Sequence, residues 1–207
     1  LLIKTVKSDC ICFCSYSKLN FIGIKFAKLL RKPSFYLMHG YRTYESMLNR
    51  EKITNDYLKR INRDEKYLFS NVTKVFCVSK KFMELMKVME PEFVDKFDYN
   101  YNGLDFDLIL QQTKRINSKK KSNQIISLGG GMKQKNNLTV CKAIEKLKRE
   151  KNLDLNYIVI GHPYGDKELI CKYDFVKYYD YLPYEKVLEL MAESYLYIQN
   201  SIFETFG

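Results

Sequence analysis

Three consecutive glycines are the residues whose type and position most directly offer chemistry. The triplet Gly129-Gly130-Gly131 follows an apolar run at 124–128 and precedes a stretch at 137–148 with apolar residues at helical spacing. Glycines between a strand and a helix let backbone N–H groups approach a phosphate closely, and the helix adds its positive end. Lys133 and Lys135 would supply two cations. The spacing is neither GxGxxG nor a Walker loop, so a purely structural tight turn is the simpler interpretation of the pattern alone.

Two further side chains could act on a substrate. His39 follows the apolar run 34–38, and open α/β sheets place functional groups at such strand ends. Glu204 stands between Phe203 and Phe206 and could be a buried carboxylate that binds hydroxyl groups. Each has an ordinary alternative, which is a packed or surface histidine in the first case and an exposed loop acid in the second.

The elements that must position these residues alternate regularly along the first half of the chain. Apolar runs of strand length are separated by longer amphipathic stretches, a pattern typical of βαβ units with a parallel sheet. We expect an ordered loop at 41–50, a helix N-cap at Ser79 and a turn at Asn102-Gly103. The expected strands are 9–15, 34–38 and 74–78, and the expected helices are 21–30, 54–69 and 80–88.

The same alternation restarts after a polar segment. Residues 111–122 include a run of three lysines and are interpreted as an interdomain connection between a first domain at 1–110 and a second at 123–207. The pattern therefore predicts an α/β protein with two doubly wound domains, both incomplete in this chain. In the second domain the expected strands are 124–128, 155–160, 176–181 and 195–199, the expected helices are 137–148 and 184–194, and a loop is expected at 201–207.

Length and composition exclude several classes of protein. With 207 residues, 46% of them hydrophobic, the chain can bury one large core or two modest ones, as a soluble globular protein does. No run approaches the roughly 20 apolar residues of a membrane-spanning helix, and Lys4 and Lys7 interrupt any signal-peptide core. No cluster of metal ligands is recognisable in the sequence.

The six cysteines could form disulfides, bind a metal or pack as reduced thiols. Cys10, Cys12 and Cys14 alternate within an apolar run, which places them on one face of a strand and outside any CxxC arrangement. Cys77 lies in another apolar run. We interpret the cysteines as reduced core residues, which indicates a cytoplasmic protein.

The charge balance permits an anionic partner. The chain has 35 basic and 24 acidic residues, a net charge of +11. The basic residues are dispersed through helical segments and no RNA-binding or helix-turn-helix signature is present, which argues against nucleic acid. An anionic membrane surface or a phosphate-bearing substrate fits better, and a solvated, lysine-rich surface without a partner is the alternative.

Taken in order, a series of short segments resembles motifs of the retaining family-4 glycosyltransferases, the group 1 glycosyl transferase family. The most specific is 200–207, Asn-Ser-Ile-Phe-Glu-Thr-Phe-Gly, which resembles the motif PS..E.FG that opens the family's Glu-x7-Glu signature. The resemblance extends over essentially the whole chain. The other matches are 182–191 with V....L...Y, 126–137 with vGRl...KG, 158–163 with iVG.GP, 78–79 with vS, 102–105 with NGvD, and His39-Gly40 with HG or HD.

The resemblance implies the GT-B fold of two Rossmann-like domains and the transfer of a sugar, with retention, from a UDP-, GDP- or ADP-sugar. It implies that Lys135 binds the donor phosphates, Glu204 contacts the donor sugar and His39 reaches the transferring sugar. A cation can offset charge on the leaving diphosphate, and a carboxylate can fix sugar hydroxyls. No cofactor and no metal are expected. The residues expected to bind the donor are Gly129, Gly130, Gly131, Lys133, Lys135, Gly161, Tyr181, Leu182, Phe206 and Gly207.

The resemblance also implies a biological setting. The acceptor is expected to be a saccharide, a lipid-linked saccharide or a protein in polysaccharide or glycoconjugate assembly. The expected location is the cytoplasm, with peripheral contact to the anionic inner face of a membrane and no nucleic-acid partner.

The sequence departs from the family pattern at several positions. The family's arginine beside the phosphate-binding lysine falls on Gly130, with Lys133 as a hypothetical substitute, and its usual glycine and proline fall on Asp180 and Asn200. The second glutamate of the signature falls beyond residue 207 and the N-terminal acceptor loop is absent, so this fragment is expected to be inactive. Two alternatives stay open: a catalytically inactive scaffold or nucleotide-binding partner subunit, and a nucleotide-sugar 2-epimerase, against which the sequence around Glu204 argues.

Overall fold

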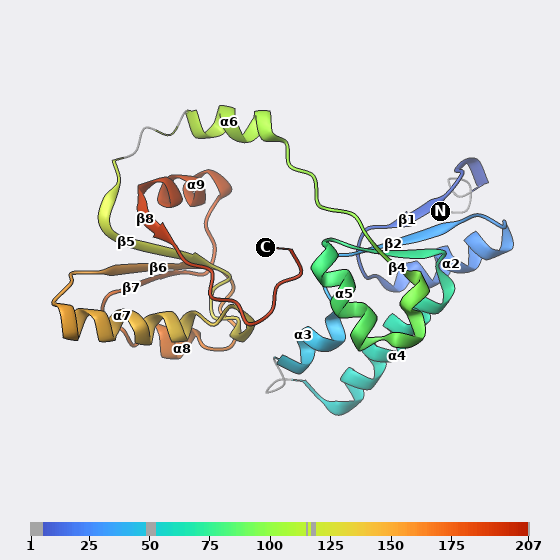
Figure 1. Ribbon diagram of the computed structural model, residues 1–207, viewed down its shortest axis with the longest axis horizontal. Coiled ribbons are helices and arrows are strands. Elements are labelled where there is room, and N and C mark those ends of the chain that lie inside the picture. Colours follow the sequence, from blue (N-terminus) through green and yellow to red (C-terminus); the bar gives the residue numbers. More distant parts are fainter. Residues whose placement is uncertain (1–5, 49–52, 115, 117–118, 207) are drawn as a thin grey trace. The chain divides into compact units, whose positions relative to one another are not determined.

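The chain forms two α/β units, each built around its own parallel sheet (Figure 1). The computed structural model describes residues 6–48, 53–114, 116 and 119–206. One unit comprises Leu1–Gly103 with Glu204–Gly207, and the other comprises Leu104–Phe203. Within the described residues each sheet has four strands, all parallel. Parallel strands joined through helices are the architecture of Rossmann-like domains.

The first sheet runs in chain order, β1–β2–β3–β4. Right-handed crossovers that all advance in one direction keep their helices on one face of such a sheet. Strand β2 shows the consequence, because Ser34, Tyr36 and Met38 are buried whereas Phe35 and Leu37, on the other face, are only half-buried. The strands are β1 (Ile11–Phe13), β2 (Ser34–Met38), β3 (Lys74–Cys77) and β4 (Phe97–Tyr99).

The helices of the first unit begin at side-chain caps and bury one apolar face. Ser79 Oγ accepts from the N–H of Phe82 at 3.1 Å, which confirms the expected cap. In α4 the buried positions include Leu58, Ile61 and Leu68, at the spacing of one helix face. The helices are α2 (Lys18–Leu29), α3 (Arg42–Leu48), α4 (Asn55–Asn71) and α5 (Lys80–Met89), followed by the 3-10 helix η2 (Pro91–Lys96).

The expectation of a loop at 41–50 is wrong over most of that range, because residues Arg42–Leu48 form helix α3. The N–H groups of Arg42 and Thr43 donate to the carboxylate of Glu65 on α4, at 2.9 and 3.0 Å. This carboxylate takes the place of a local N-cap. Residues 49 and 50 lie outside the described part of the chain.

The expectation that the cysteines are core residues holds for only two of them. Cys77 and Cys141 are buried, whereas Cys10, Cys12, Cys14 and Cys171 are exposed. Cys12 pairs in register with Phe35, so it lies on the sheet face opposite the one that packs on α2. Of the three alternating cysteines only Cys12 lies within β1, and apolar periodicity does not tell which face of a strand the helices cover.

The second sheet has the order β7–β6–β5–β8, with helices on both faces (Figure 1). Ile125, Tyr157 and Val159 pack toward α7 and α8, whereas Ile126 and Ile158 pack toward α9. Burial on both faces explains why these strands are nearly continuous apolar runs. The elements are β5 (Lys121–Leu128), η3 (Lys133–Lys135), α7 (Asn137–Lys151), β6 (Asn156–Ile160), α8 (Lys167–Ile170), β7 (Val176–Tyr179), α9 (Tyr184–Glu193) and β8 (Ser194–Tyr197).

The segment between the sheets differs from the expected connection at 111–122. Helix α6 (Phe106–Lys114) extends into its start, and β5 already begins at Lys121. Residues 115, 117 and 118 of this segment lie outside the described residues. The boundary between the units falls after Gly103 and not after residue 110. Across the described ranges, no helix combines the length and apolar content needed to cross a bilayer.

Candidate functional site

The candidate site of the second unit lies at the carboxyl edge of its sheet. The chain proceeds from β5 to β6 and β7 in one direction and then returns to place β8 on the other side of β5. This reversal creates a topological switch point between β5 and β8, where open α/β sheets bind ligands. The glycine triplet follows β5 and residues 198–203 follow β8. The N–H of Ile202 donates to the carbonyl of Gln134 at 2.8 Å, which joins the two segments.

The glycine triplet is bonded to the turn that follows β6. The amides of Gly129 and Gly130 both donate to the carbonyl of Ile160, at 2.8 and 3.0 Å, and Gly131 donates to the carbonyl of His162 at 3.2 Å. These three N–H groups therefore have partners within the protein. The triplet therefore forms the structural tight turn that the sequence pattern allowed as the simpler interpretation. Because its amides are already bonded, an anion at this edge must be bound mainly by other groups.

The absence of side chains at the triplet allows this close approach. Gly130 has φ +59°, and a Cβ on it would lie 2.4 Å from the carbonyl carbon of Gly161. A Cβ on Gly131 would lie 2.2 Å from the carbonyl oxygen of Tyr164. Two backbone segments meet here at distances that no other residue type permits.

Lys133 and Lys135 lie on η3, between the triplet and the first turn of α7. Both side chains are half-buried. The stem of Lys135 lies over Gly129, since a Cβ on Gly129 would be 2.4 Å from Lys135 Cγ. The N-terminus of α7 carries the positive end of the helix dipole. Two ammonium groups and a helix N-terminus thus follow the strand that borders the switch point.

A buried chain of hydrogen bonds fixes the loop to the sheet. The hydroxyl of Tyr157 on β6 lies 2.7 Å from Ser127 Oγ and 3.0 Å from Asn137 Oδ1. Ser127 donates to the carbonyl of Ile198 at 2.6 Å, and Asn137 Nδ2 donates to the carbonyl of Gly130 at 2.7 Å. Burial raises the pKa of Tyr157, so its hydroxyl stays neutral. The network joins β5, β6, the residue that follows β8, the glycine triplet and the first residue of α7.

Ser201 is a candidate residue that sequence reasoning did not single out. Its Oγ atom is buried and has no hydrogen-bond partner within the described ranges. A buried polar atom without a partner destabilises a protein by about 1–3 kcal/mol, so its presence calls for an explanation. Ser201 directly precedes Ile202, whose N–H is bonded to the η3 segment, so the hydroxyl belongs to the switch-point region. The sequence feature that could have identified Ser201 is its position in the motif at residues 200–207.

The remaining candidates of the second unit occupy turns at the same edge. Gly161 has φ +139° and its N–H donates to the carbonyl of Tyr179 at 2.9 Å. Tyr181 and Leu182 lie in the turn between β7 and α9, where Tyr181 is 80% exposed and Leu182 packs against the α9 side of the sheet. The structure therefore brings Gly161 to the glycine triplet and leaves the ring of Tyr181 accessible. Among the described residues, no group of three or more acidic, histidine or cysteine side chains could hold a metal ion.

In the first unit, His39 follows β2 directly and its side chain is exposed. Thr205 Oγ1 donates to the carbonyl of His39 at 2.7 Å, and Ser79 Oγ donates to the carbonyl of Thr205 at 2.6 Å. The carboxyl end of β2, the N-cap of α5 and the segment that begins at Glu204 therefore meet within this unit.

The other candidates of this segment have different surroundings. Glu204 is half-buried, and Phe206 is exposed with its ring centroid 6.3 Å from that of Tyr101. Gly207 lies outside the described residues.

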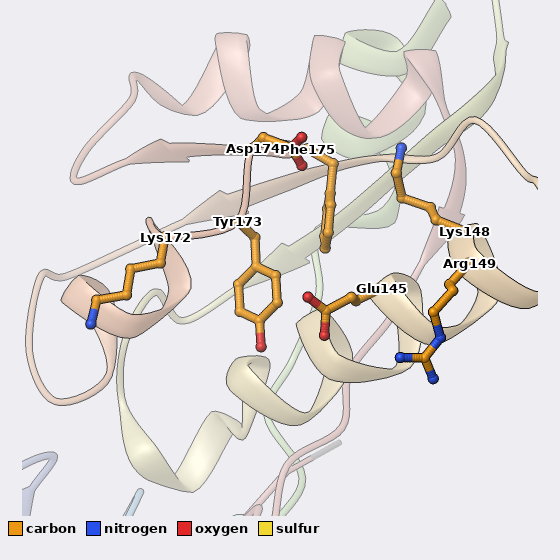
Figure 2. Close-up of a pocket in the computed structure, with 7 residues that line it drawn as sticks. All are labelled: Glu145, Lys148, Arg149, Lys172, Tyr173, Asp174 and Phe175. Carbon is orange, nitrogen blue, oxygen red and sulfur yellow. The ribbon is translucent and has the colours of Figure 1, made fainter.

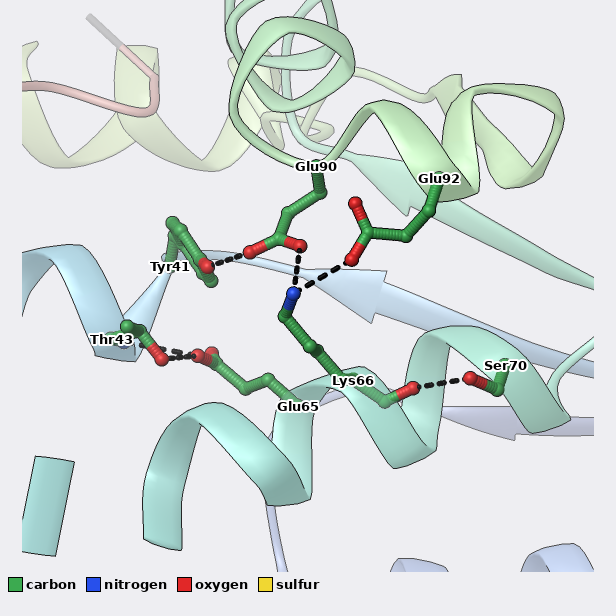
Figure 3. A network of polar contacts seen from close by, with 7 residues as sticks. All are labelled: Tyr41, Thr43, Glu65, Lys66, Ser70, Glu90 and Glu92. Atoms are coloured by element: carbon green, nitrogen blue, oxygen red, sulfur yellow. Dashed lines mark hydrogen bonds and ion pairs between the residues drawn. The ribbon is translucent and has the colours of Figure 1, made fainter. Parts of the chain in front are cut away.

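A polar network holds the residues that follow His39 (Figure 3). Glu65 is fully buried, and beyond the two amides at the start of α3 its carboxylate accepts from Thr43 Oγ1 at 2.6 Å. Burial raises the pKa of Glu65 to about 7, although its hydrogen bonds with Thr43 and Arg42 oppose the shift. The Glu65 carboxyl group therefore determines where the strand-to-helix turn after His39 lies.

A second set of contacts in Figure 3 connects the same turn to η2. The hydroxyl of Tyr41 donates to Glu90, whose carboxylate also pairs with Lys66 at 3.2 Å. Lys66 pairs with Glu92 at 2.7 Å, and its hydrogen bonds with Glu92 and Glu90 raise its pKa. Side chains from α4 and from Glu90, at the junction of α5 and η2, thus hold the turn from two directions.

A separate hollow of about 600 Å³ lies at the opposite, amino edge of the second sheet (Figure 2). Its residues come from the C-terminal half of α7 and the segment before β7, which is the edge away from the glycine triplet. Cations and carboxylates share its wall, so it presents no single charge to a ligand. It is lined by Glu145, Lys148, Arg149, Lys172, Tyr173, Asp174 and Phe175.

Comparison with protein families bears on the carboxyl edge of the second unit. Residues 110–207 match the family Glycosyl transferases group 1. The matched segment is just under half of the chain, and it contains the glycine triplet, Lys133, Lys135, the Gly161 turn and Ser201. A search among curated proteins gives no match.

Solved structures share the fold over nearly the whole chain. The pneumococcal O-GlcNAc transferase GtfA in complex with UDP and GlcNAc aligns with a TM-score of 0.62, at 15% identity, over 97% of this chain and 39% of its own. An α-glucosyltransferase in complex with UDP and a 13-mer DNA containing a central A:G mismatch aligns with a TM-score of 0.55, at 13% identity, over 98% and 55%. The UDP-GlcNAc 2-epimerase from Methanocaldococcus jannaschii aligns with a TM-score of 0.47, at 12% identity, over 95% and 58%.

The two transferase alignments confirm the expected class, an α/β fold with two Rossmann-like domains. The chain spans 39% and 55% of the length of these two proteins. At such identities the likeness is one of fold, and function has to be argued from the site.

Proposed function

We propose that this chain carries the donor-binding part of a glycosyltransferase that moves a sugar, with retention, from a nucleotide-diphosphate donor to an acceptor. One observation carries the proposal. The segment that matches Glycosyl transferases group 1 has two lysines, a helix N-terminus and an unpartnered buried hydroxyl at the switch point of a parallel sheet. Such a point is where α/β sheets bind nucleotides.

In the proposed donor complex, Lys135 offsets charge that builds on the leaving diphosphate, assisted by Lys133 and the N-terminus of α7. Ser201 donates its hydrogen bond to a donor oxygen. The three glycines and Gly161 contribute by shape, because their missing side chains let the loops after β5 and β6 pack closely together and so form the edge that the donor meets. The exposed ring of Tyr181, with Leu182 beside it, receives the base.

The roles of the remaining residues rest on the family resemblance. His39 contacts the transferring sugar, Glu204 fixes its hydroxyls, and Phe206 and Gly207 complete the donor contacts. UDP is the first donor nucleotide to test, because both transferase structures with a related fold are complexes with UDP. The acceptor in this proposal is a saccharide, lipid-linked saccharide or protein, in glycoconjugate assembly at a cytoplasmic membrane face.

Isothermal titration of the protein with UDP, GDP and ADP tests the donor site. We expect one nucleotide to bind selectively, and Lys135→Ala to weaken its binding about tenfold or more, because a charge-assisted contact to phosphate is worth about 1.5–3 kcal/mol. Ser201→Ala should weaken binding less, by about three- to tenfold, through the loss of one neutral hydrogen bond.

Lys172→Ala is the matched control, because Lys172 lies in the hollow at the opposite edge of the sheet. It should leave nucleotide affinity unchanged. Absence of binding for all three nucleotides at millimolar concentration, or equal losses in Lys135→Ala and Lys172→Ala, would remove the basis of the proposal.

A nucleotide-binding subunit without catalysis is the second candidate, and Gly130 favours it. This residue stands where the family has an arginine, and the backbone of Gly161 fills the space that a side chain would need. Transfer of radiolabelled sugar to an added acceptor by the full-length protein separates the two candidates. Selective nucleotide binding without transfer identifies the subunit, whereas transfer that Glu204→Ala abolishes identifies the enzyme.

A further inference from the structure

An ion pair joins α8 to the turn that carries Tyr181. Lys167, the first residue of α8, has its Nζ atom 2.6 Å from Oδ1 and 2.8 Å from Oδ2 of Asp180, which directly follows β7. The same ammonium group lies 5.3 Å from the centroid of the Tyr178 ring. An exposed ion pair by itself holds a flexible lysine weakly, and contact with an aromatic face adds attraction. The pair is therefore a defined contact between two elements.

The backbone of Lys167 packs against the glycine triplet. A Cβ on Gly131 would lie 2.7 Å from the backbone nitrogen of Lys167, and the N–H of Asp166 donates to the carbonyl of Gly131 at 2.8 Å. The side chain of Lys167 meanwhile reaches Asp180. One residue thus connects the triplet, at the proposed phosphate end of the donor, to the turn at the proposed base end.

The turn at 180–183 enters α9 through a proline. Pro183 is the N-cap residue of α9, and a proline has no side-chain acceptor for the first amides of a helix. The end of β7 is fixed, because the N–H of Gly161 donates to the carbonyl of Tyr179 at 2.9 Å. Tyr181, two residues further on, is 80% exposed. The contact through Asp180 therefore lies directly before the residue that would meet the base.

Asp180 is also a position at which this sequence departs from the pattern of the family, which has a glycine there. A glycine has no side chain to pair, so the contact belongs to the sequence of this chain. A carboxylate near the site of an anionic diphosphate repels it unless a cation lies beside that carboxylate. Lys167 is such a cation, and its position accounts for the presence of an acid in this turn.

We propose that Lys167 and Asp180 are a positioning pair that holds the turn at 180–183 where Tyr181 and Leu182 meet the donor base, and that the pair thereby determines which nucleotide is selected. This inference rests on the proposed function, in which the turn receives the base. The alternative is a simple effect of charge, in which Lys167 attracts the anionic donor and Asp180 repels it. The two differ in sign, because positioning needs both side chains, whereas charge alone makes Asp180 unfavourable.

Isothermal titration of the protein with UDP, GDP and ADP measures the effect on selection. We expect Lys167→Met and Asp180→Asn each to weaken binding of the selected nucleotide about three- to fivefold, because each substitution breaks the pair. Binding of the other two nucleotides should change by about twofold or less, since the diphosphate is common to all three and exposed charges are screened. The affinity ratio between the selected nucleotide and the others therefore falls in both variants.

Two further variants test whether the pair acts as a unit. Lys167→Met combined with Asp180→Asn should lose no more affinity than either single variant, because one substitution already breaks the pair. Lys167→Arg keeps a cation opposite the carboxylate and should bind the selected nucleotide within about twofold of the wild type.

The matched control is the ion pair between Lys121 and Glu193, at 2.7 Å. It joins the first residue of β5 to the last residue of α9, at the amino edge of the same sheet. Lys121→Met and Glu193→Gln make the same chemical changes as the two test variants. Both should leave the affinity and the selection among nucleotides within about twofold of the wild type.

Three results would overturn the positioning role: weaker binding in Lys167→Met beside tighter binding in Asp180→Asn, equal weakening of all three nucleotides, or losses that the control variants reproduce. The first result would assign the pair an effect of charge alone. Absence of nucleotide binding by the wild-type protein would remove the proposed function together with this inference. Selective binding that the variants leave unchanged would remove the inference alone.

Discussion

Glu65 is a single residue whose ionisation is linked to the stability of the first unit. The ordinary pKa of a glutamate is 4.5, whereas burial raises the pKa of folded Glu65 to about 7. Between these values the folded state binds a proton that the unfolded state has released. This contribution to stability is therefore fully present below pH 4.5 and is lost as the pH rises through 7.

We expect the free energy of unfolding to be higher at pH 5 than at pH 8, with Glu65 contributing up to about 3 kcal/mol of the difference. Glu65→Gln should flatten this dependence because the amide does not titrate. It should also lower stability at pH 5 by about 1–3 kcal/mol, since its NH₂ group faces a backbone donor at the start of α3. Urea denaturation followed by circular dichroism at both pH values measures these effects.

Glu84→Gln on α5 is the control, because Glu84 is exposed. It should preserve the pH dependence of the wild-type protein. Retention of the same dependence in Glu65→Gln would show that other groups cause it.

At the scale of elements, the contact between the loops after β5 and β6 depends on two glycines. Gly130→Ala would place a methyl group against the backbone of Gly161 and hold a non-glycine residue at φ +59°. We expect a loss of at least about 2 kcal/mol in the free energy of unfolding. Urea denaturation of the variant measures it.

Gly103→Ala is the matched comparison, because a Cβ at Gly103 would meet nothing within 4 Å. Its effect should stay within about 0.5 kcal/mol. If the two substitutions lowered the free energy of unfolding equally, the close approach of the two loops would not be the cause of the loss in Gly130→Ala.

Element prediction from the sequence succeeded where the signal is local. The bounds 34–38 are those of β2, and the Ser79 cap needs only a serine ahead of an amphipathic run. Helix α3 was missed because its cap is Glu65, on another helix. Strand β4 was missed because only Phe97 of its three residues is buried, too short a pattern to recognise.

The candidate site was predictable in place but not in its chemistry. Glycines after a strand indicated the carboxyl edge of the sheet. Lys133 and Lys135 were expected at the same edge because they come two and four residues after the triplet in the sequence. That the glycine amides bond to Ile160 and His162 depends on the β6 turn, which is distant in sequence. The unpartnered hydroxyl of Ser201 likewise appears only when the chain is folded, since burial is a property of the neighbours of a residue.

At the scale of the whole molecule, the net charge of +11 makes the proposed contact with an anionic membrane face sensitive to salt. Screening shortens from about 10 Å at 0.1 M to about 3 Å at 1 M ionic strength. We expect binding to phosphatidylglycerol vesicles, measured by cosedimentation, to fall about tenfold or more over this range. Binding independent of salt would contradict the electrostatic part of the contact.

The packing at Gly130 also makes the effect of a substitution there depend on a second position. An added Cβ would lie 2.4 to 2.5 Å from the backbone of Gly161 and the carbonyl of His162. An arginine could therefore stand at this position only if the turn at 161–165 moved. Alone, the substitution would disrupt the loop before it offered a cation. Whether a cation can be added here is thus decided by the residues of the neighbouring turn as much as by residue 130 itself.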